Sequence, residues 1–252
     1  MASVARDALT RYLDELLKPE TFKDYCPNGL QVEGRSQITR VICGVTANQA
    51  LLDLAVTERA DAILVHHGWF WRGESGAVTG IKRNRLKTLL SHDINLYAYH
   101  LPLDAHPTLG NNAGLAQAAG WRQTGVFGEQ NLGCIGEPAA GSTVASLTVD
   151  LGRALGRAPL VLAESADQPV RRLAWCTGGA QSYFEAAISA GADAFVTGEV
   201  SEPMVHLARE TGVAYFAAGH HATERFGVQA LGAEIAAHFG VAVDYVEVDS
   251  PV

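Results

Sequence analysis

An internal repeat of a strand, a helix and a second strand is the feature that most limits how this chain can fold. Both copies carry the tripeptide Ala-Asp-Ala, beginning at residue 60 and again at residue 192, and this fixes their register. Because two parallel strands need a long crossover, usually a helix, each copy predicts one such unit of a parallel sheet. The predicted segments are 41–45, 50–57 and 60–65 in the first copy, and 173–177, 183–189 and 192–197 in the second.

Each copy continues with a further helix and strand, and both of these strands are followed by a histidine and an acidic residue. The pairs are His100 with Asp104 and His220 with Glu224, four positions apart in each case. We therefore predict an α/β fold of two similar lobes related by the repeat. The further elements are a helix at about 85–90 and a strand at 94–99 in the first copy, and a helix at about 203–210 and a strand at 213–217 in the second.

The two lobes are expected to divide the chain at two points while forming one compact domain together. Residues 1–125 with 225–252 would form the first lobe, including a terminal helix and strand, and residues 126–224 would form the second. The segment 125–170 is rich in glycine, proline and alanine, as is typical of a boundary region. The first 17 residues mix charged and apolar side chains at helical spacing, so we expect an amphipathic helix there and no signal peptide.

Two histidines follow the second strand of the first copy directly. His66 and His67 come after the apolar run 63–65, and at the carboxyl end of a strand both can face the crevice where open α/β sheets bind their ligands. An adjacent histidine pair alone is more often an ordinary surface or core feature. Its coincidence with the two strand-end pairs favours a metal site. The candidate ligands are His66, His67, His100, Asp104, His220 and Glu224.

The number of candidate ligands indicates how many ions the site would hold. A catalytic zinc ion uses three protein ligands and a water, so six groups exceed what one ion needs. Two ions sharing a carboxylate fit better, since paired ions lie ~3.5–4 Å apart in two-metal sites. Imidazole suits Zn and Fe, whereas carboxylates shift the preference toward Mn. We therefore predict two divalent ions per chain: Zn, Mn or Fe.

Other polar and glycine residues near the predicted strand ends have less specific interpretations. Glu199 occupies the position in the second copy that corresponds to the histidine pair, so it is a candidate general base or substrate contact. His106 and His221 stand close to the candidate ligands in sequence and are candidates for orienting them. Gly178 and Gly179 lie at a strand-to-helix turn, where backbone amides can bind an anion; a tight turn explains them equally well.

Composition limits the environment and the partners. Lys+Arg 19 against Asp+Glu 27 gives a net charge of −8, which argues against broad nucleic-acid binding because phosphate neutralisation needs a positive surface. A short basic segment, 82–87, is either a solvated helix start or a local anion contact. Four cysteines without a C-x-x-C pair favour free thiols in a reducing cytoplasm, and no apolar run approaches the ~20 residues that span a bilayer.

Taken together, the motifs resemble the NGG-one-interacting-factor-three family, whose members are also called GTP cyclohydrolase I type 2 homologues. The resemblance extends from about residue 12 to 248 and is closest to the short bacterial members. It implies a two-lobed α/β fold with a dinuclear metal centre in the cleft, held by the same six ligands. It also implies a ring-shaped homo-hexamer, a trimer of dimers with a central opening. The matching segments are Asn28–Val32, His66–Gly68, His100–Asp104, Thr197–Val200 and Gly219–Arg225.

One departure from the family pattern falls beside the candidate ligands. Many members have proline after the histidine pair, whereas this chain has Gly68 followed by Trp69, Phe70 and Trp71. This aromatic run is expected to change the apolar wall of the pocket.

These observations favour a metal-dependent hydrolase, cyclohydrolase-like, that acts on a nucleotide or a related heterocycle. The main alternative is a metal storage, delivery or regulatory protein without catalysis, because the ligand set alone does not distinguish the two. A ring associated with nucleic acid is a weaker alternative, since the net charge opposes it.

Overall fold

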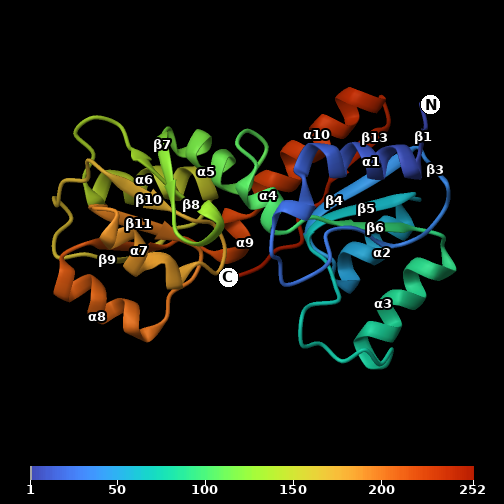
Figure 1. Cartoon of the computed structure of the whole chain (residues 1–252), viewed down its shortest axis with the longest axis horizontal. Helices are drawn as coiled ribbons and strands as arrows, with labels where there is room; N and C mark the ends of the chain where they lie inside the picture. The colour runs from blue at the N-terminus through green and yellow to red at the C-terminus, as the bar shows by residue number, and fades with distance from the viewer. Residues whose placement is uncertain (1) are drawn as a thin grey trace. The chain divides into compact units, whose positions relative to one another are not determined.

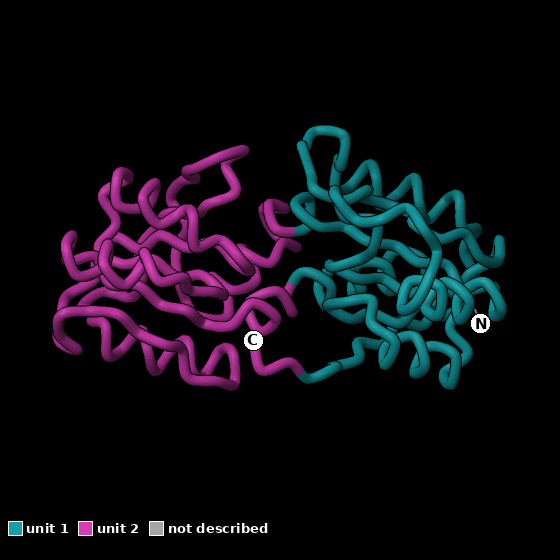
Figure 2. Tube along the Cα trace, turned by 90° about the horizontal axis from the view of Figure 1, so that it is seen from below, with its two compact units in different colours: residues 1–103, 227–249 teal, residues 104–226, 250–252 magenta. Residues whose placement is uncertain are grey.

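The computed structural model describes residues 2–252 and divides into two compact units, coloured separately in Figure 2. The first unit comprises the residues up to Leu103 together with Gly227–Asp249, and the second comprises Asp104–Phe226 with Ser250–Val252. The chain therefore leaves the first unit within one helix, α4 (Leu101–Ala105), and returns to it within another, α10 (Arg225–Phe239).

The first unit contains, within the described residues, a five-stranded sheet of order β13-β4-β5-β6-β2 and a two-stranded sheet β1-β3. Strands β13, β4, β5 and β6 are parallel, and β2 lies antiparallel at one edge. The elements besides α10 are β1 (Val4–Ala5), α1 (Arg6–Leu17), the 3-10 helix η1 (Pro19–Thr21), β2 (Gly29–Val32), β3 (Gln37–Ile38), β4 (Arg40–Thr46), α2 (Gln49–Thr57), β5 (Ala62–His67), α3 (Gly80–Ser91), β6 (Asn95–Ala98) and β13 (Ala242–Tyr245).

The second unit contains, over the residues described, a six-stranded sheet of order β7-β8-β10-β11-β12-β9. Three of its inner strands, β10, β11 and β12, are parallel, and the other pairings are antiparallel. The elements are α5 (Asn111–Ala119), β7 (Arg122–Phe127), η2 (Glu129–Asn131), β8 (Gly133–Glu137), α6 (Val144–Leu155), β9 (Leu160–Leu162), β10 (Leu173–Trp175), η3 (Gln181–Tyr183), α7 (Phe184–Ser189), β11 (Ala194–Thr197), α8 (Glu202–Thr211), β12 (Ala214–Ala217) and α9 (His220–Thr223).

The internal repeat is present in the structure, and the predicted α/β fold of two similar lobes is confirmed. Strands β4, β5 and β6 form a parallel triplet in the first unit, as β10, β11 and β12 do in the second. In each unit the third strand of the triplet also pairs with an antiparallel edge strand, β2 or β9. The repeat therefore comprises four strands in each unit.

The aspartate of the repeated tripeptide has the same role in both copies. The Oδ2 atom of Asp61 accepts hydrogen bonds from the backbone amides of Thr39 and Arg40, at 2.6 and 3.1 Å. The Oδ2 atom of Asp193 accepts the amides of residues 171–172, both at 2.8 Å. Each aspartate thus ties the start of its strand to the start of the preceding strand, which explains why the sequence marks the register there.

The five-stranded and the six-stranded sheet are each covered by helices on both faces, as parallel strands require (Figure 1). In the first unit Ile42, Ile63 and Leu96 pack with α2 and α3, while Cys43 and Tyr97 face the side of α10 and α1. Because side chains alternate along a strand, neighbouring residues enter different cores. A fully buried side chain of this size stabilises the fold by about 1.5–3 kcal/mol.

The second unit has the same arrangement. Trp175, Val196 and Phe216 pack with α5 and α6. On the other face Phe195 and Phe184 stack with ring centroids 5.8 Å apart, in a layer with α7 and α8 (Figure 1). Both units are thus three-layer structures with a core on each side of the sheet.

The first division of the chain lies earlier than the sequence indicated, and the predicted boundary at 125/126 is corrected to 103/104. Leu115 and Ala116 of α5 are buried in the core of the second unit, and this helix packs on α6. Pro251 and Val252 also belong to the second unit, where the Pro251 carbonyl accepts a hydrogen bond from Arg157 at 2.9 Å. The second division, at 226/227, lies two residues from the predicted one.

The N-terminal amphipathic helix is present as α1, although it begins at Arg6 because Val4–Ala5 forms strand β1. Met1, with which the predicted helix began, lies outside the described residues. Between residues 2 and 252, no helix is both long enough and apolar enough to cross a membrane.

Candidate metal centre

Three of the predicted metal ligands come together in the first unit. Strand β5 ends with His66 and His67, and His100 follows the neighbouring parallel strand β6. One ligand atom of each histidine lies within 4.8 Å of the others. The grouping follows from the sheet, because the carboxyl ends of adjacent parallel strands meet at one edge.

The rings of His66 and His67 are held from behind through their Nδ1 atoms. His66 Nδ1 lies 3.0 Å from the backbone carbonyl of Tyr99, which can only accept, so this nitrogen carries the proton. His67 Nδ1 lies 3.2 Å from Thr46 Oγ1. A proton on Nδ1 leaves the Nε2 lone pair available, which is the tautomer that a metal bound at Nε2 requires.

His100 is held by a carboxylate that the sequence pattern did not indicate. Its Nδ1 atom donates to Oδ1 of Asp24 at 2.7 Å, and its backbone amide donates to Oδ1 of Asn28 at 2.7 Å. Asp24 Oδ2 accepts from Asn28 Nδ2 and from the Leu101 amide at 2.9 and 3.0 Å. Burial raises the pKa of Asp24, but the hydrogen bond and charge of His100, together with the hydrogen bonds from Asn28 and the Tyr25 amide, outweigh it and the pKa falls to about 2.

Within the aromatic run after the histidine pair, Trp71 lies against this cluster, whereas Trp69 and Phe70 pack with the hydrophobic core. The Trp71 and His100 rings meet edge to face, with centroids 4.9 Å apart, and Trp71 Nε1 donates to the Gly68 carbonyl at 3.1 Å. Gly68 itself has no room for a side chain, because an added Cβ would overlap Gln31 and Ala98. Glycine at this position therefore follows from close packing against β2 and β6.

In the second unit His220 lies between two carboxylates. Its Nε2 atom is 3.0 Å from Oε2 of Glu224 and its Nδ1 atom is 2.7 Å from Oε1 of Glu199. Burial lowers the pKa of His220, but the two carboxylates outweigh it and raise the pKa to about 9. Glu199 Oε2 also accepts from Gln181 Nε2 at 3.3 Å. Glu199 thus contacts a predicted ligand directly and orients its ring.

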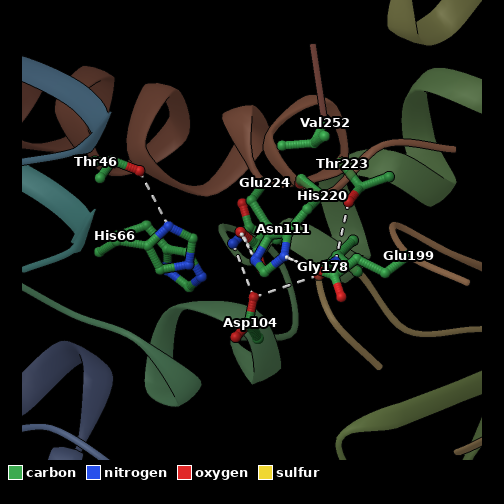
Figure 3. A network of polar contacts seen from close by, with 12 residues as sticks. Thr46, His66, Asp104, Asn111, Gly178, Glu199, His220, Thr223, Glu224 and Val252 are labelled. Atoms are coloured by element: carbon green, nitrogen blue, oxygen red, sulfur yellow. Dashed lines mark hydrogen bonds and ion pairs between the residues drawn. The ribbon is translucent and has the colours of Figure 1, made fainter. Parts of the chain in front are cut away.

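Asp104, also in the second unit, is held by residues of α5 and of the turn after β10. Its Oδ1 atom accepts from Asn111 Nδ2 at 2.8 Å and from Thr177 Oγ1 at 3.3 Å, and Asn112 Nδ2 donates to its backbone carbonyl at 3.2 Å. These donors fix the side chain of Asp104 (Figure 3).

The glycines proposed as an anion contact have a structural role beside Glu224. Gly178 adopts φ +71°, and its amide donates to Thr223 Oγ1 at 3.0 Å (Figure 3), so the turn uses this donor. An added Cβ at Gly178 would overlap the Glu224 carboxylate, and one at Gly179 would lie 3.4 Å from the His220 ring. For Gly178 this favours the tight-turn interpretation.

The two histidines proposed to orient the ligands have other contacts in the structure. His106 Nδ1 accepts the backbone amide of Leu109 at 3.1 Å, and burial lowers the pKa of this histidine. The His221 amide donates to the Val252 carbonyl at 3.0 Å. Their action on the metal ligands stays a prediction.

The donor sets fit a divalent transition metal. The first unit offers three imidazoles, the number of protein ligands at a catalytic zinc ion. Two of them donate Nδ1–H to an oxygen acceptor, which is the outer contact that metal-bound histidines make. The second unit offers one imidazole with Glu224 and Asp104, and carboxylates broaden the choice to Mn and Fe.

A family model described as Duf34/NIF3 (NGG1p interacting factor 3) matches residues 4–251. The chain belongs to this family. Among its relatives, a Pseudomonas aeruginosa protein named GTP cyclohydrolase 1 type 2 homolog is 52% identical and covers 99% of this chain and 98% of its own length. An Escherichia coli protein of the same name is 49% identical, with 96% and 98% covered.

Several solved structures have the same fold. A protein described as ybgI, of unknown function, matches with a TM-score of 0.95 at 47% identity, over 99% of this chain and 100% of that one. TTHA1606 from Thermus thermophilus matches with a TM-score of 0.87 at 35% identity, again over 99% and 100%. HcgD from Methanocaldococcus jannaschii, at 20% identity and a TM-score of 0.85 over 98% and 100%, supports the fold alone.

Proposed function

We propose that this family member is a dinuclear metal-dependent hydrolase acting on a nucleotide or a related heterocycle. The three-histidine cluster of the first unit, with outer contacts that set its tautomers, is the observation that carries the proposal. In this proposal Asp104, His220 and Glu224 of the second unit are metal ligands as well. His100 and Asp104, one in each unit, are four residues apart in the sequence.

Bound metal would supply an activated water near neutral pH and stabilise negative charge on the substrate. Around it, Asp24 and the Tyr99 carbonyl would hold the imidazoles of His100 and His66 in their ligand tautomers. Trp71 would exclude water from one side of His100.

Glu199 would have two roles in this reaction. It keeps the Nδ1 proton on His220 through the 2.7 Å contact, and its side chain is 44% exposed, so its carboxylate can exchange protons with solvent. We propose that Glu199 is the general base, or the group that shuttles the proton from the water to the leaving group.

The nucleotide-like substrate is proposed from the name shared by the relatives, GTP cyclohydrolase 1 type 2 homolog. Two carboxylates and four imidazoles suit hydrolysis at a ring carbon or at a phosphoryl group, because both reactions develop negative charge on oxygen. We also propose a homo-hexamer, built as a trimer of dimers, on the family resemblance. Light scattering of the purified chain measures its mass and would exclude the hexamer if the protein is monomeric.

The number of metal ions bound per chain tests the dinuclear centre directly. We expect close to two ions per chain after purification without chelator, and a sharp fall in the Glu224→Ala variant. His206→Ala is the control, because this exposed histidine on α8 pairs with Glu202 of the same helix and is not a candidate ligand. Fewer than one ion in the wild type after loading with Zn, Mn and Fe would overturn the dinuclear centre.

Substrate turnover is measured next, on the metal-loaded protein with GTP, other nucleotides and simple phosphoesters. We expect Glu199→Gln to lower kcat by about 10²–10⁴-fold, the range for loss of a general acid or base. Two retained ions with no turnover on any of these compounds would favour metal storage over catalysis. Rapid release of the ions to a chelator would favour delivery.

A further inference from the structure

A cavity of about 360 Å³ in the first unit lies apart from the metal-binding side chains. It is formed by the segment 69–79 and the start of α3, both visible in Figure 1. One part of its wall is apolar, made by Trp69, Ala77 and Ile81, and the charged part is made by Glu74, Lys82 and Arg85. Lys82 and Arg85 belong to the short basic segment whose role the sequence left open.

Arg85 is half-buried, and one of its N–H groups has no acceptor in the protein. Its Nε atom is buried and has no hydrogen-bond partner, and within residues 2–252 the structure shows no ion pair for its guanidinium. Arginine stays protonated at any physiological pH. A buried charged donor without an acceptor is costly, so it points to an acceptor that the protein itself does not supply.

The other charges of the cavity are already matched with each other. Lys82 Nζ donates to the Ser75 carbonyl at 2.9 Å, lies 4.0 Å from Glu74 Oε2 and lies 5.1 Å from the centre of the Phe70 ring. Lys82 therefore neutralises the negative charge of Glu74. One positive charge, that of Arg85, remains for a ligand.

We propose that this cavity binds a small organic monocarboxylate with an aromatic or aliphatic body. A guanidinium matches a carboxylate in charge and in its forked geometry, and the apolar wall with Trp69 suits the body of the ligand. A volume of about 360 Å³ is at the small end of ligand pockets. A phosphate monoester would bring a second negative charge that the cavity does not neutralise.

Isothermal titration of the full chain with benzoate tests the proposal, with phenyl phosphate and benzyl alcohol as comparison ligands. We expect benzoate to bind more tightly than phenyl phosphate, and benzyl alcohol to bind much more weakly. Arg85→Gln should weaken benzoate binding by about tenfold or more, since it removes the charge-assisted pair. Arg83→Gln is the matched control, because Arg83 is exposed on the same helix and does not line the cavity.

Three results would overturn the proposal: no benzoate binding in the wild type, equal binding in Arg85→Gln, or equal weakening by Arg83→Gln. The last would show a diffuse electrostatic effect of the helix. Tighter binding of phenyl phosphate than of benzoate would replace the carboxylate with a phosphate ligand. Metal content and the thermal transition of both variants, measured alongside, separate loss of the cavity from loss of the fold or of the metal centre.

Discussion

At the scale of single residues, the contacts behind the histidines decide which of their nitrogens can bind a metal. Sequence spacing identified His66, His67 and His100 because they follow strands. It did not identify Asp24, which reaches His100 across 76 residues of chain. The available signal was Asp24 and Asn28, four apart and just before β2, but their joint contact with His100 depends on the antiparallel pairing of β2 with β6.

Asp24→Asn is expected to weaken zinc binding by about 10–100-fold, the usual effect of removing an outer carboxylate from a histidine ligand. The amide can still accept a hydrogen bond from His100, so the fold should be retained. A competitive titration with a zinc indicator measures the affinity, and Asp53→Asn on the exposed face of α2 is the control. Unchanged affinity in Asp24→Asn would mean that the Tyr99 and Thr46 contacts suffice to order the cluster.

Asp61 gives a pH-dependent contribution to stability. Burial raises its pKa, but the hydrogen bonds from Thr39 and the charge of Arg35 outweigh it, so the pKa in the folded protein is lowered. A carboxyl with a lowered folded pKa stabilises the protein above its unfolded pKa of about 3.9. That contribution is lost as the pH falls through the folded pKa.

We therefore expect Asp61→Asn to lower the free energy of unfolding near neutral pH, and the difference from the wild type to shrink as the pH falls below about 4. Urea denaturation near pH 7, 5 and 3 measures the difference. If the difference in the free energy of unfolding stays constant from pH 7 to pH 3, Asp61→Asn destabilises the protein by changing the hydrogen-bond geometry and not by removing a charge.

At the scale of elements, strand ends and the turns after them determine the site. The parallel triplets were predictable because each is an apolar run repeated in register. The antiparallel strands β2, β7, β8 and β9 were not predicted, since they belong to short segments without such a pattern; β7 is largely exposed. The helix α5 was assigned to the wrong lobe, because only the packing of Leu115 shows which core it joins.

Gly178, in the turn after β10, has no room for a side chain. Gly178→Ala should lose metal affinity, because its Cβ would displace the Glu224 carboxylate, and stability should fall by on the order of 1–3 kcal/mol from backbone strain. Gly141→Ala separates the two effects: Gly141 also has positive φ, +80°, but an added Cβ meets nothing within 4 Å. Thermal unfolding and metal titration of both variants measure them. Equal metal affinity in the two variants would contradict the assigned role of Gly178.

At the scale of the whole molecule, the first unit is built from two separate stretches of chain. Strand β13 completes its sheet beside β4, and the α10 side chains Val228, Leu231 and Ile235 are fully buried. The second unit is continuous except for residues 250–252.

We expect a fragment of residues 1–103 to be unfolded, because it lacks α10 and β13, and a fragment of residues 104–226 to fold cooperatively around its own core. Far-UV circular dichroism and a urea transition of each fragment measure this. Adding a separate peptide of residues 227–249 to the first fragment should restore part of its structure. A cooperative transition in the 1–103 fragment alone would contradict the expectation.

Because the chain returns to the first unit near its C-terminal end, this unit cannot complete its fold before the second unit has been synthesised. Domains usually fold from the N-terminus as they emerge. Here the early half must wait, with the α10-facing side of its sheet uncovered, until residues 227–249 have left the exit tunnel. The later half can complete its core first. During synthesis the nascent first half is therefore the part most exposed to aggregation and the part most in need of a chaperone.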